Sequence, residues 1–460
     1  MWKKLPVITI KKIIEKVLTG SRYCLLQRTP VNTVLISSSI FIIALILIFS
    51  EKVNRTIVAL SGAVVMVAVG DALGFYTRNQ VIESVDFNTL GLLLGMMILV
   101  ALLEPTGFFQ YIAVYVGKLS KGNPTVLLIL LGIVTTIISM FLDNVTSVVL
   151  MAPVTILICE IIGVSAVPFL MAEALLSDTG GVATMVGDPP NILIASAAGF
   201  SFNDFLAKSL PIVLIILVII IVLLLRLFKS ELKPNGNIDL EALEHLNPSE
   251  ALKDKRSSIK VIIVIGIAIL GFLLEEHIHM APSFIALAAA SIGLLWIRPD
   301  VKETLKLISW DILLFFACLF VMVGAMEASG VLQLLADYIV TGVNLPPVVF
   351  GVLILWLVAI LSALVDNVPM TIALIPVIQN LGQSGIDVNP LWWALVFGAG
   401  FGGNGTIIGS TANIVVASLS EKTRTPITPR LWSKVGLPVM LIACAVASVL
   451  YVAVYYLIGF

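Results

Sequence analysis

The stretch FLDNVTSVVLMAPV, residues 141–154, places an aspartate and an asparagine between two apolar runs. The same order returns 223 positions later in LVDNVPMTIALIPV, residues 364–377. An aspartate at the centre of a membrane helix costs about 2.5–3.5 kcal/mol, so two at matching positions indicate a function. Non-helical backbone at membrane depth is tolerated only where protein or a water-filled cavity surrounds it. We therefore expect two helical hairpins that break at Asp-Asn tips inside the protein.

The composition is typical of a polytopic α-helical membrane protein. Of the 460 residues, 59% are hydrophobic and 12% are charged, whereas soluble domains carry about 25% charged residues. A crossing helix needs about 20 apolar residues. Eight apolar runs are the expected plain crossings: 32–50, 56–74, 89–104, 208–228, 259–275, 281–297, 311–327 and 434–457.

An internal duplication divides the chain into two halves. GGVATMVGDPPNILIAS (180–196) aligns without a gap to GGNGTIIGSTANIVVAS (402–418). Eight of the seventeen positions are identical, where about one match is expected by chance. The predicted organisation is a basic amphipathic N-terminal segment (1–30), a first transport repeat (31–228), a polar cytoplasmic linker (229–258) and a second transport repeat (259–460).

The number of crossings predicts that the repeats are inverted. If each Asp-Asn segment enters and leaves the membrane on one side, each half has five crossings, and an odd number reverses the second half. With the linker inside, this arrangement keeps most lysines and arginines of the loops inside and leaves little beyond Arg78 and Lys208 in the outer loops. The basic segment 1–30, which it places outside, conflicts with this bias. The predicted fold is all-α, with about ten transmembrane helices, two re-entrant hairpins and two broken helices.

The hairpin tips are the predicted ion-binding elements. The second arm of each hairpin begins just after Asp143-Asn144 or Asp366-Asn367, and its free N–H groups carry partial positive charge. An anion can bind there, and the Asp and Asn oxygens can hold a small cation beside it. The alternative is that the two aspartates only cap the second arms.

The Gly-rich turns are the second pair of interruptions. Two prolines in GDPPN cannot continue the preceding helix, but they suit the first turn of a new half-helix that contains Asn191. The turn glycines have an alternative explanation, which is close packing of helices. Asp178 and Asp188 flank the first turn, whereas their counterparts are Gly400 and Ser410. The two sites are therefore chemically unequal, and Asp178, Asp188 and Ser410 are secondary site candidates.

These stretches together resemble the arsenical pump membrane protein / melanosomal P protein family. That family belongs to the ion transporter superfamily, which also holds dicarboxylate and citrate symporters related to the divalent-anion/Na⁺ symporters, and a branch of Na⁺/H⁺ antiporters. The resemblance extends from about residue 32 to the end, and GDPPN and GGNGT are specific for its P-protein side. Dicarboxylate members carry Ser-Asn-Thr at their hairpin tips, where this chain carries Asp-Asn-Val.

The resemblance implies an elevator-type motion of the hairpin domain and a homodimer in the lipid bilayer. The expected ion-coupling residues are the tip residues with the turns that face them: Asp143, Asn144, Gly180, Gly181, Asp366, Asn367, Gly403 and Asn404. The expected substrate-binding residues are Asn144, Thr146, Thr184, Pro189, Asn191, Asn367, Thr406, Thr411 and Asn413.

The expected function is secondary active transport of a small anion or metalloid oxyanion, arsenite-like or carboxylate-like, coupled to H⁺ or Na⁺. The motif stretches contain no lysine or arginine. An anion would therefore be held by helix N-termini and Asn and Thr side chains alone. This favours a weakly charged species, or an anion that travels with a cation. A Na⁺/H⁺ antiporter and an anion channel are the alternatives.

An enzyme is not expected, because the chain has no HExxH, GxSxG or Walker motif. No cofactor is expected beyond the coupling ion, and the four scattered cysteines give no metal-site spacing. The net charge of −1 gives no indication of a nucleic-acid partner. The sequence leaves open whether a separate ATPase assists transport. We expect the protein in the inner or plasma membrane of a prokaryotic cell.

Overall fold

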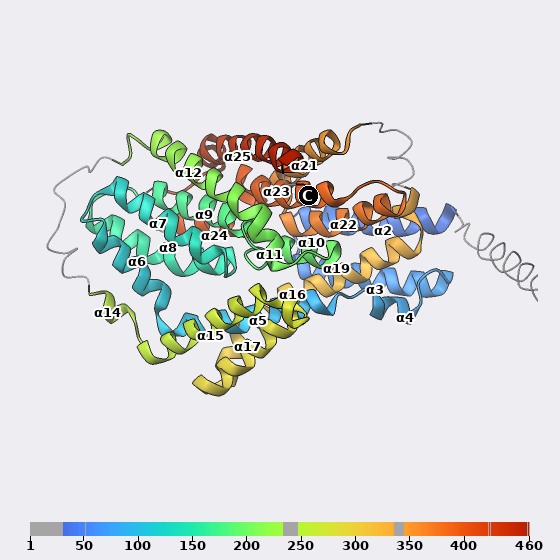
Figure 1. Ribbon diagram of the computed structural model, residues 1–460, viewed down its shortest axis with the longest axis horizontal. Helices are drawn as coiled ribbons and strands as arrows, with labels where there is room; N and C mark the ends of the chain where they lie inside the picture. The colour runs from blue at the N-terminus through green and yellow to red at the C-terminus, as the bar shows by residue number, and fades with distance from the viewer. Residues whose placement is uncertain are drawn as a thin grey trace, which may run out of the picture.

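The computed structural model describes residues 31–50, 52–232, 247–334, 345–421, 423, 425–457 and 459. Within these residues every regular element is helical (Figure 1), which confirms the predicted all-α fold. The predicted amphipathic segment 1–30 and residues 233–246 of the predicted linker lie outside the described residues.

Each of the eight predicted plain crossings is a helix. They are α2 (Val31–Phe49), α3 (Arg55–Leu73), α5 (Phe87–Leu103), α12 (Leu210–Leu227), α15 (Lys255–Leu273), α17 (Pro282–Ile297), α19 (Trp310–Ala328) and α25 (Pro429–Leu457). By length and composition, eight of the described helices can cross a membrane, and these include one arm of each hairpin. The chain is therefore an integral membrane protein.

The two Asp-Asn segments form helix–turn–helix hairpins as predicted. The first pairs α7 (Pro124–Ser139) with α8 (Asn144–Ile161), and the second pairs α21 (Pro347–Leu364) with α22 (Asn367–Gln383). Asp143 accepts the Thr146 N–H at 2.9 Å, and Asp366 accepts the Val368 N–H at 3.1 Å. Both aspartates are thus N-caps of the second arms, as the alternative explanation proposed. Capping uses only part of each carboxylate, so it leaves room for a second role.

The two Gly-rich stretches break helices at corresponding points. α9 (Val167–Gly181) is followed by α10 (Pro189–Ala198), and α23 (Asn389–Gly402) is followed by two short turns, η3 (Gly403–Gly405) and η4 (Ile407–Gly409), and then α24 (Thr411–Ser420). Asn191 Nδ2 donates to the carbonyls of Gly181 (2.9 Å) and Thr184 (2.8 Å). Asn413 Nδ2 donates to the corresponding carbonyls of Gly403 (3.0 Å) and Thr406 (3.1 Å). The internal duplication is therefore visible in the geometry of the turns.

Glycines bring the broken helices against the first hairpin arms. A Cβ on Gly180 would lie 2.7 Å from the Thr136 carbonyl oxygen of α7, and a Cβ on Gly402 would lie 2.6 Å from the Ala359 carbonyl oxygen of α21. Such distances exclude any side chain without movement of the backbone. The close-packing explanation is thus confirmed for these two positions.

The helices form two groups that meet at the hairpin tips. One group contains α7–α10, α12 and α21–α25, and the other contains α2, α3, α5, α15, α17 and α19. Contacts are extensive within the first group and within each of the two bundles of the second group (α2, α3 and α19; α5, α15 and α17). The contacts of α19 with α22, of α5 with α10 and of α5 with α19 are smaller. The remaining elements are α4 (Arg78–Glu83), η1 (Glu104–Thr106), α6 (Phe108–Leu119), α11 (Phe202–Asp204), the π-helical η2 (Phe205–Ser209), α14 (Pro248–Ala251), α16 (Glu275–Ile278) and α18 (Val301–Lys306).

Candidate functional site

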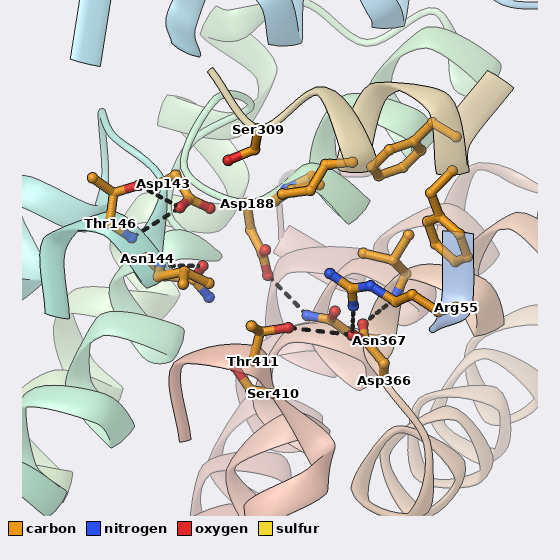
Figure 2. A pocket seen from close by; sticks show the side chains of 16 residues that line it. Arg55, Asp143, Asn144, Thr146, Asp188, Ser309, Asp366, Asn367, Ser410 and Thr411 are labelled. Carbon is orange, nitrogen blue, oxygen red and sulfur yellow. Dashed lines mark hydrogen bonds and ion pairs between the residues drawn. The ribbon is translucent and has the colours of Figure 1, made fainter. Parts of the chain in front are cut away.

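A cavity of about 100 Å³ lies where the two hairpin tips meet the starts of the two half-helices (Figure 2). Residues 143–146 come from the first tip and 366–368 from the second. Residues 188–189 begin α10, and residues 410–411 begin α24. The volume holds several water molecules or a small ion. Both repeats therefore contribute to one site.

The first hairpin tip is bound to a buried aspartate behind the cavity wall. Asn144 Nδ2 and Ser410 Oγ both donate to Asp178 Oδ1, each at 2.9 Å. Within the described residues the other carboxylate oxygen, Asp178 Oδ2, has no hydrogen-bond partner. A buried carboxylate oxygen without a donor is suited to a cation.

The second hairpin tip faces a different aspartate of the first repeat. Asn367 Nδ2 donates to Asp188 Oδ2 at 3.1 Å. Asp366 Oδ2 accepts a hydrogen bond from Arg55 Nη1 at 2.5 Å and a longer one from Thr411 Oγ1 at 3.4 Å. Figure 2 shows these side chains on one side of the cavity, with Asp143, Asn144 and Thr146 on the other. The two tips therefore differ in their partners, as the sequence predicts.

Arg55 is a charged residue of the cavity that the sequence did not predict. It begins α3, and its guanidinium carbon lies 5.4 Å from the ring centroid of Phe315 in α19. From the sequence we expected helix N-termini and Asn and Thr side chains alone to hold an anion. This expectation is wrong, because Arg55 lines the cavity. No motif in the sequence marks Arg55, since it lies outside the duplicated stretches and 311 residues from Asp366.

The second wall of the cavity also lies outside the duplicated stretches. Ser309 precedes α19, and Ile312, Phe315 and Phe316 belong to it. These residues combine one hydroxyl with an apolar surface, which is typical of small-molecule sites. A sequence scan for repeated motifs does not find them, because the first repeat has no matching stretch that lines the cavity.

The predicted site residues divide between the cavity and its support. Those that line the cavity are Asp143, Asn144, Thr146, Asp188, Pro189, Asp366, Asn367, Ser410 and Thr411. The Thr184 hydroxyl donates to the Met140 carbonyl and the Thr406 hydroxyl donates to the Ala363 carbonyl, so both tie the turns to the hairpin tips. Those that support the cavity from behind are Asp178, Gly180, Gly181, Thr184, Asn191, Gly403, Asn404, Thr406 and Asn413. Direct ligand roles for the supporting residues stay predictions.

Carboxyl groups outnumber cationic groups in the lining of the cavity. Three carboxylates line it, from Asp143, Asp188 and Asp366, against the single guanidinium of Arg55. Like charges repel strongly where the dielectric constant is low. When these carboxyl groups are ionised, the cavity attracts a cation more readily than a lone anion.

Comparison with known proteins identifies the family. A family model described as "Citrate transporter" matches residues 45–398. The chain belongs to the citrate transporter family. One relative is the 46 kDa membrane protein of Mycobacterium leprae, which is 38% identical over 424 residues. The alignment covers 90% of this chain and 97% of that protein. An uncharacterized transporter of Mycobacterium tuberculosis is 37% identical over 429 residues, with the same two coverages.

The human P protein is 31% identical over 497 residues, which cover 90% of this chain and 59% of the P protein. This match confirms the resemblance that the Asp-Asn and Gly-rich motifs predict. The crystal structure of the Alcanivorax borkumensis YdaH transporter has a TM-score of 0.61 and 16% sequence identity, and it covers 88% of this chain and 99% of that one. At this identity the likeness shows the fold alone. Membership of the citrate transporter family identifies the chain as a membrane transporter.

Proposed function

We propose that the chain is a secondary active transporter that moves a small anion across the membrane together with H⁺ or Na⁺. The observation that carries the proposal is the cavity at which both hairpin tips and both half-helix starts meet. Paired interruptions at corresponding positions of two repeats are typical of the binding sites of secondary transporters. The N-termini of α8, α22, α10 and α24 supply partial positive charge for an anion.

Citrate is the first substrate to consider, because the family model carries that description. A metalloid oxyanion such as arsenite is the second. The excess of carboxylates supports coupling, since an anion binds favourably there only with a cation. Within the described residues one oxygen of Asp178 and the side-chain oxygen of Asn404 have no hydrogen-bond partner, and this supports a cation site behind the first tip, which Asn144 joins to Asp178. We propose no cofactor beyond this coupling ion.

The motion that we propose is of the elevator type. The group formed by α7–α10, α12 and α21–α25 would move against the group formed by α2, α3, α5, α15, α17 and α19, because the contacts between the two groups are small compared with those inside the first group. Inverted repeats would allow the same hairpin geometry to face either side of the membrane in turn. We also propose that the protein forms a homodimer in the plasma membrane of a prokaryotic cell.

A Na⁺/H⁺ antiporter is the second candidate function, and the three carboxylates of the cavity favour it. Reconstitution into proteoliposomes separates the two. Citrate and arsenite are supplied in turn under imposed H⁺ or Na⁺ gradients, with protein-free liposomes as the control. Saturable anion uptake that follows one gradient supports the proposal. Na⁺ and H⁺ exchange without anion flux supports the antiporter, and large uncoupled currents support a channel.

A further inference from the structure

We propose that Arg55 exchanges partners during transport. It pairs with Asp366 when the site is empty, and with the negative group of the substrate when the site is loaded. The inference rests on the proposed function and deepens it, because it names the side chain that recognises the anion and the carboxylate that competes for it.

The geometry leaves the Arg55–Asp366 pair open to a ligand. The two side chains are 30% and 21% exposed, so the pair lines the cavity and is not sealed within the protein. A guanidinium has five N–H donors in a fixed fork and matches carboxylates and oxyanions well. Within the described residues one of these donors is used, in the bond to Asp366. The others are free for a substrate.

The pair also spans the boundary between the two groups of helices. Arg55 begins α3 and lies against Phe315 of α19, so it is anchored to one group. Asp366 is at the tip of the second hairpin and belongs to the other group. Any displacement of the hairpins relative to α3 therefore breaks the pair, and both charges then need new partners.

The charges around Asp366 show what its new partner must be. Asp143 and Asp188 line the same cavity, Asp178 lies behind it, and all three are acidic. The Thr411 hydroxyl is neutral, and within the described residues no second lysine or arginine lines the cavity. Asp366 without Arg55 therefore takes up H⁺ or Na⁺. An anion that binds Arg55 therefore requires that one cation bind Asp366. This requirement couples the flux of the anion to the flux of H⁺ or Na⁺.

A permanent salt bridge that merely joins α3 to the second hairpin is the alternative. It predicts that removal of either partner has the same effect, since both changes break the same bridge. Partner exchange predicts opposite effects on anion binding. Arg55→Gln removes the group that binds the anion, whereas Asp366→Asn removes the competitor and leaves Arg55 available.

The test is a thermal-unfolding assay on the full chain in detergent, with citrate as the probe at fixed pH and Na⁺ concentration. The citrate concentration at half-maximal stabilisation is measured for each variant. We expect Asp366→Asn to lower it about tenfold and Arg55→Gln to raise it about tenfold, where tenfold corresponds to about 1.4 kcal/mol. Arg55→Lys keeps the charge without the fork, so an intermediate value is expected and provides a second variant if Arg55→Gln does not fold.

The exposed residues Arg78 and Asp71 provide matched controls. Arg78→Gln and Asp71→Asn should leave the citrate midpoint unchanged. The exchange is overturned if the citrate midpoints of Arg55→Gln and Asp366→Asn shift in the same direction, or if they do not shift. It is also overturned if citrate has no effect on the unfolding of Asp366→Asn. Gradient-driven flux in the wild type together with such midpoints leaves the proposed function standing. Opposite shifts without gradient-driven flux keep the anion-binding role of Arg55 and remove the secondary-transport proposal.

Discussion

Replacement of Gly402 by alanine should displace one wall of the cavity. The new Cβ would lie 2.6 Å from the Ala359 carbonyl oxygen, 2.7 Å from Ala359 Cα and 2.8 Å from Ser362 Cβ. Two of these atoms are backbone and cannot rotate away. Carbon atoms pack best at about 3.5–4.0 Å, so α23 must move from α21 by roughly 0.5–1 Å. Overpacking of this kind costs about 1–3 kcal/mol.

The displacement should also impair transport, because Gly402 leads directly into the turn that ends at Thr411. In enzymes a misplacement of a reacting group by about 1 Å can lower the reaction rate about 100-fold. By analogy we expect Gly402→Ala to lower the transport flux about 10- to 100-fold. The assay measures flux per folded molecule in proteoliposomes together with the apparent unfolding temperature in detergent.

Gly266→Ala is the matched control for this prediction. Gly266 lies inside α15, and a Cβ there meets nothing within 4 Å. Alanine in a helix is favoured over glycine by about 0.5–1 kcal/mol, so this variant should be neutral or slightly more stable. If Gly402→Ala matches Gly266→Ala in flux and unfolding temperature, the reasoning from close packing is refuted.

Three further predictions concern the tips and the topology. Asn144→Ala and Asn367→Ala should each abolish most flux while the protein still assembles, as judged by size-exclusion chromatography. Normal flux per folded molecule with reduced stability would assign the two asparagines a purely structural role. Asp143→Asn should change the pH dependence of flux between about pH 5.5 and 8.5, because a carboxylate without an ion pair in the described chain is removed from the cavity; a wild-type profile contradicts this. Single cysteines at Ser249 and Leu457, in a cysteine-free background, should label with an impermeant reagent from opposite sides of the membrane, and labelling from one side rules out inverted repeats.

Local chemistry explains why so much of the fold could be predicted from the sequence. Asp143 and Asp366 cap the helices that follow them, and Pro189 begins α10, because these residues impose helix boundaries through their own backbone and side-chain bonds. For the glycines at 180 and 402 the sequence left two explanations open, a turn that faces the hairpin tip and close packing of helices. The structure decides between them by placing each against a carbonyl oxygen.

The composition of the cavity could be predicted only in part. The tip residues and half-helix starts carry repeated motifs, and the structure brings them together. Arg55 carries no motif, and its partner Asp366 is on a distant hairpin, so only the packing of α3 and α19 against that hairpin reveals it. Thr184 and Thr406 are the opposite case, because they belong to a repeated motif but do not line the cavity. Their hydroxyl groups instead donate hydrogen bonds to carbonyls of the hairpins.

Accumulation of citrate against its own concentration gradient tests the central claim most directly. Proteoliposomes are loaded with citrate at the external concentration, and an inward H⁺ or Na⁺ gradient is then imposed. The account predicts that internal citrate rises above the external concentration, that an ionophore returns it to equality, and that the double variant Asn144→Ala/Asn367→Ala accumulates none. Internal citrate that stays equal to external citrate under the H⁺ gradient and also under the Na⁺ gradient would contradict coupled citrate transport at this cavity.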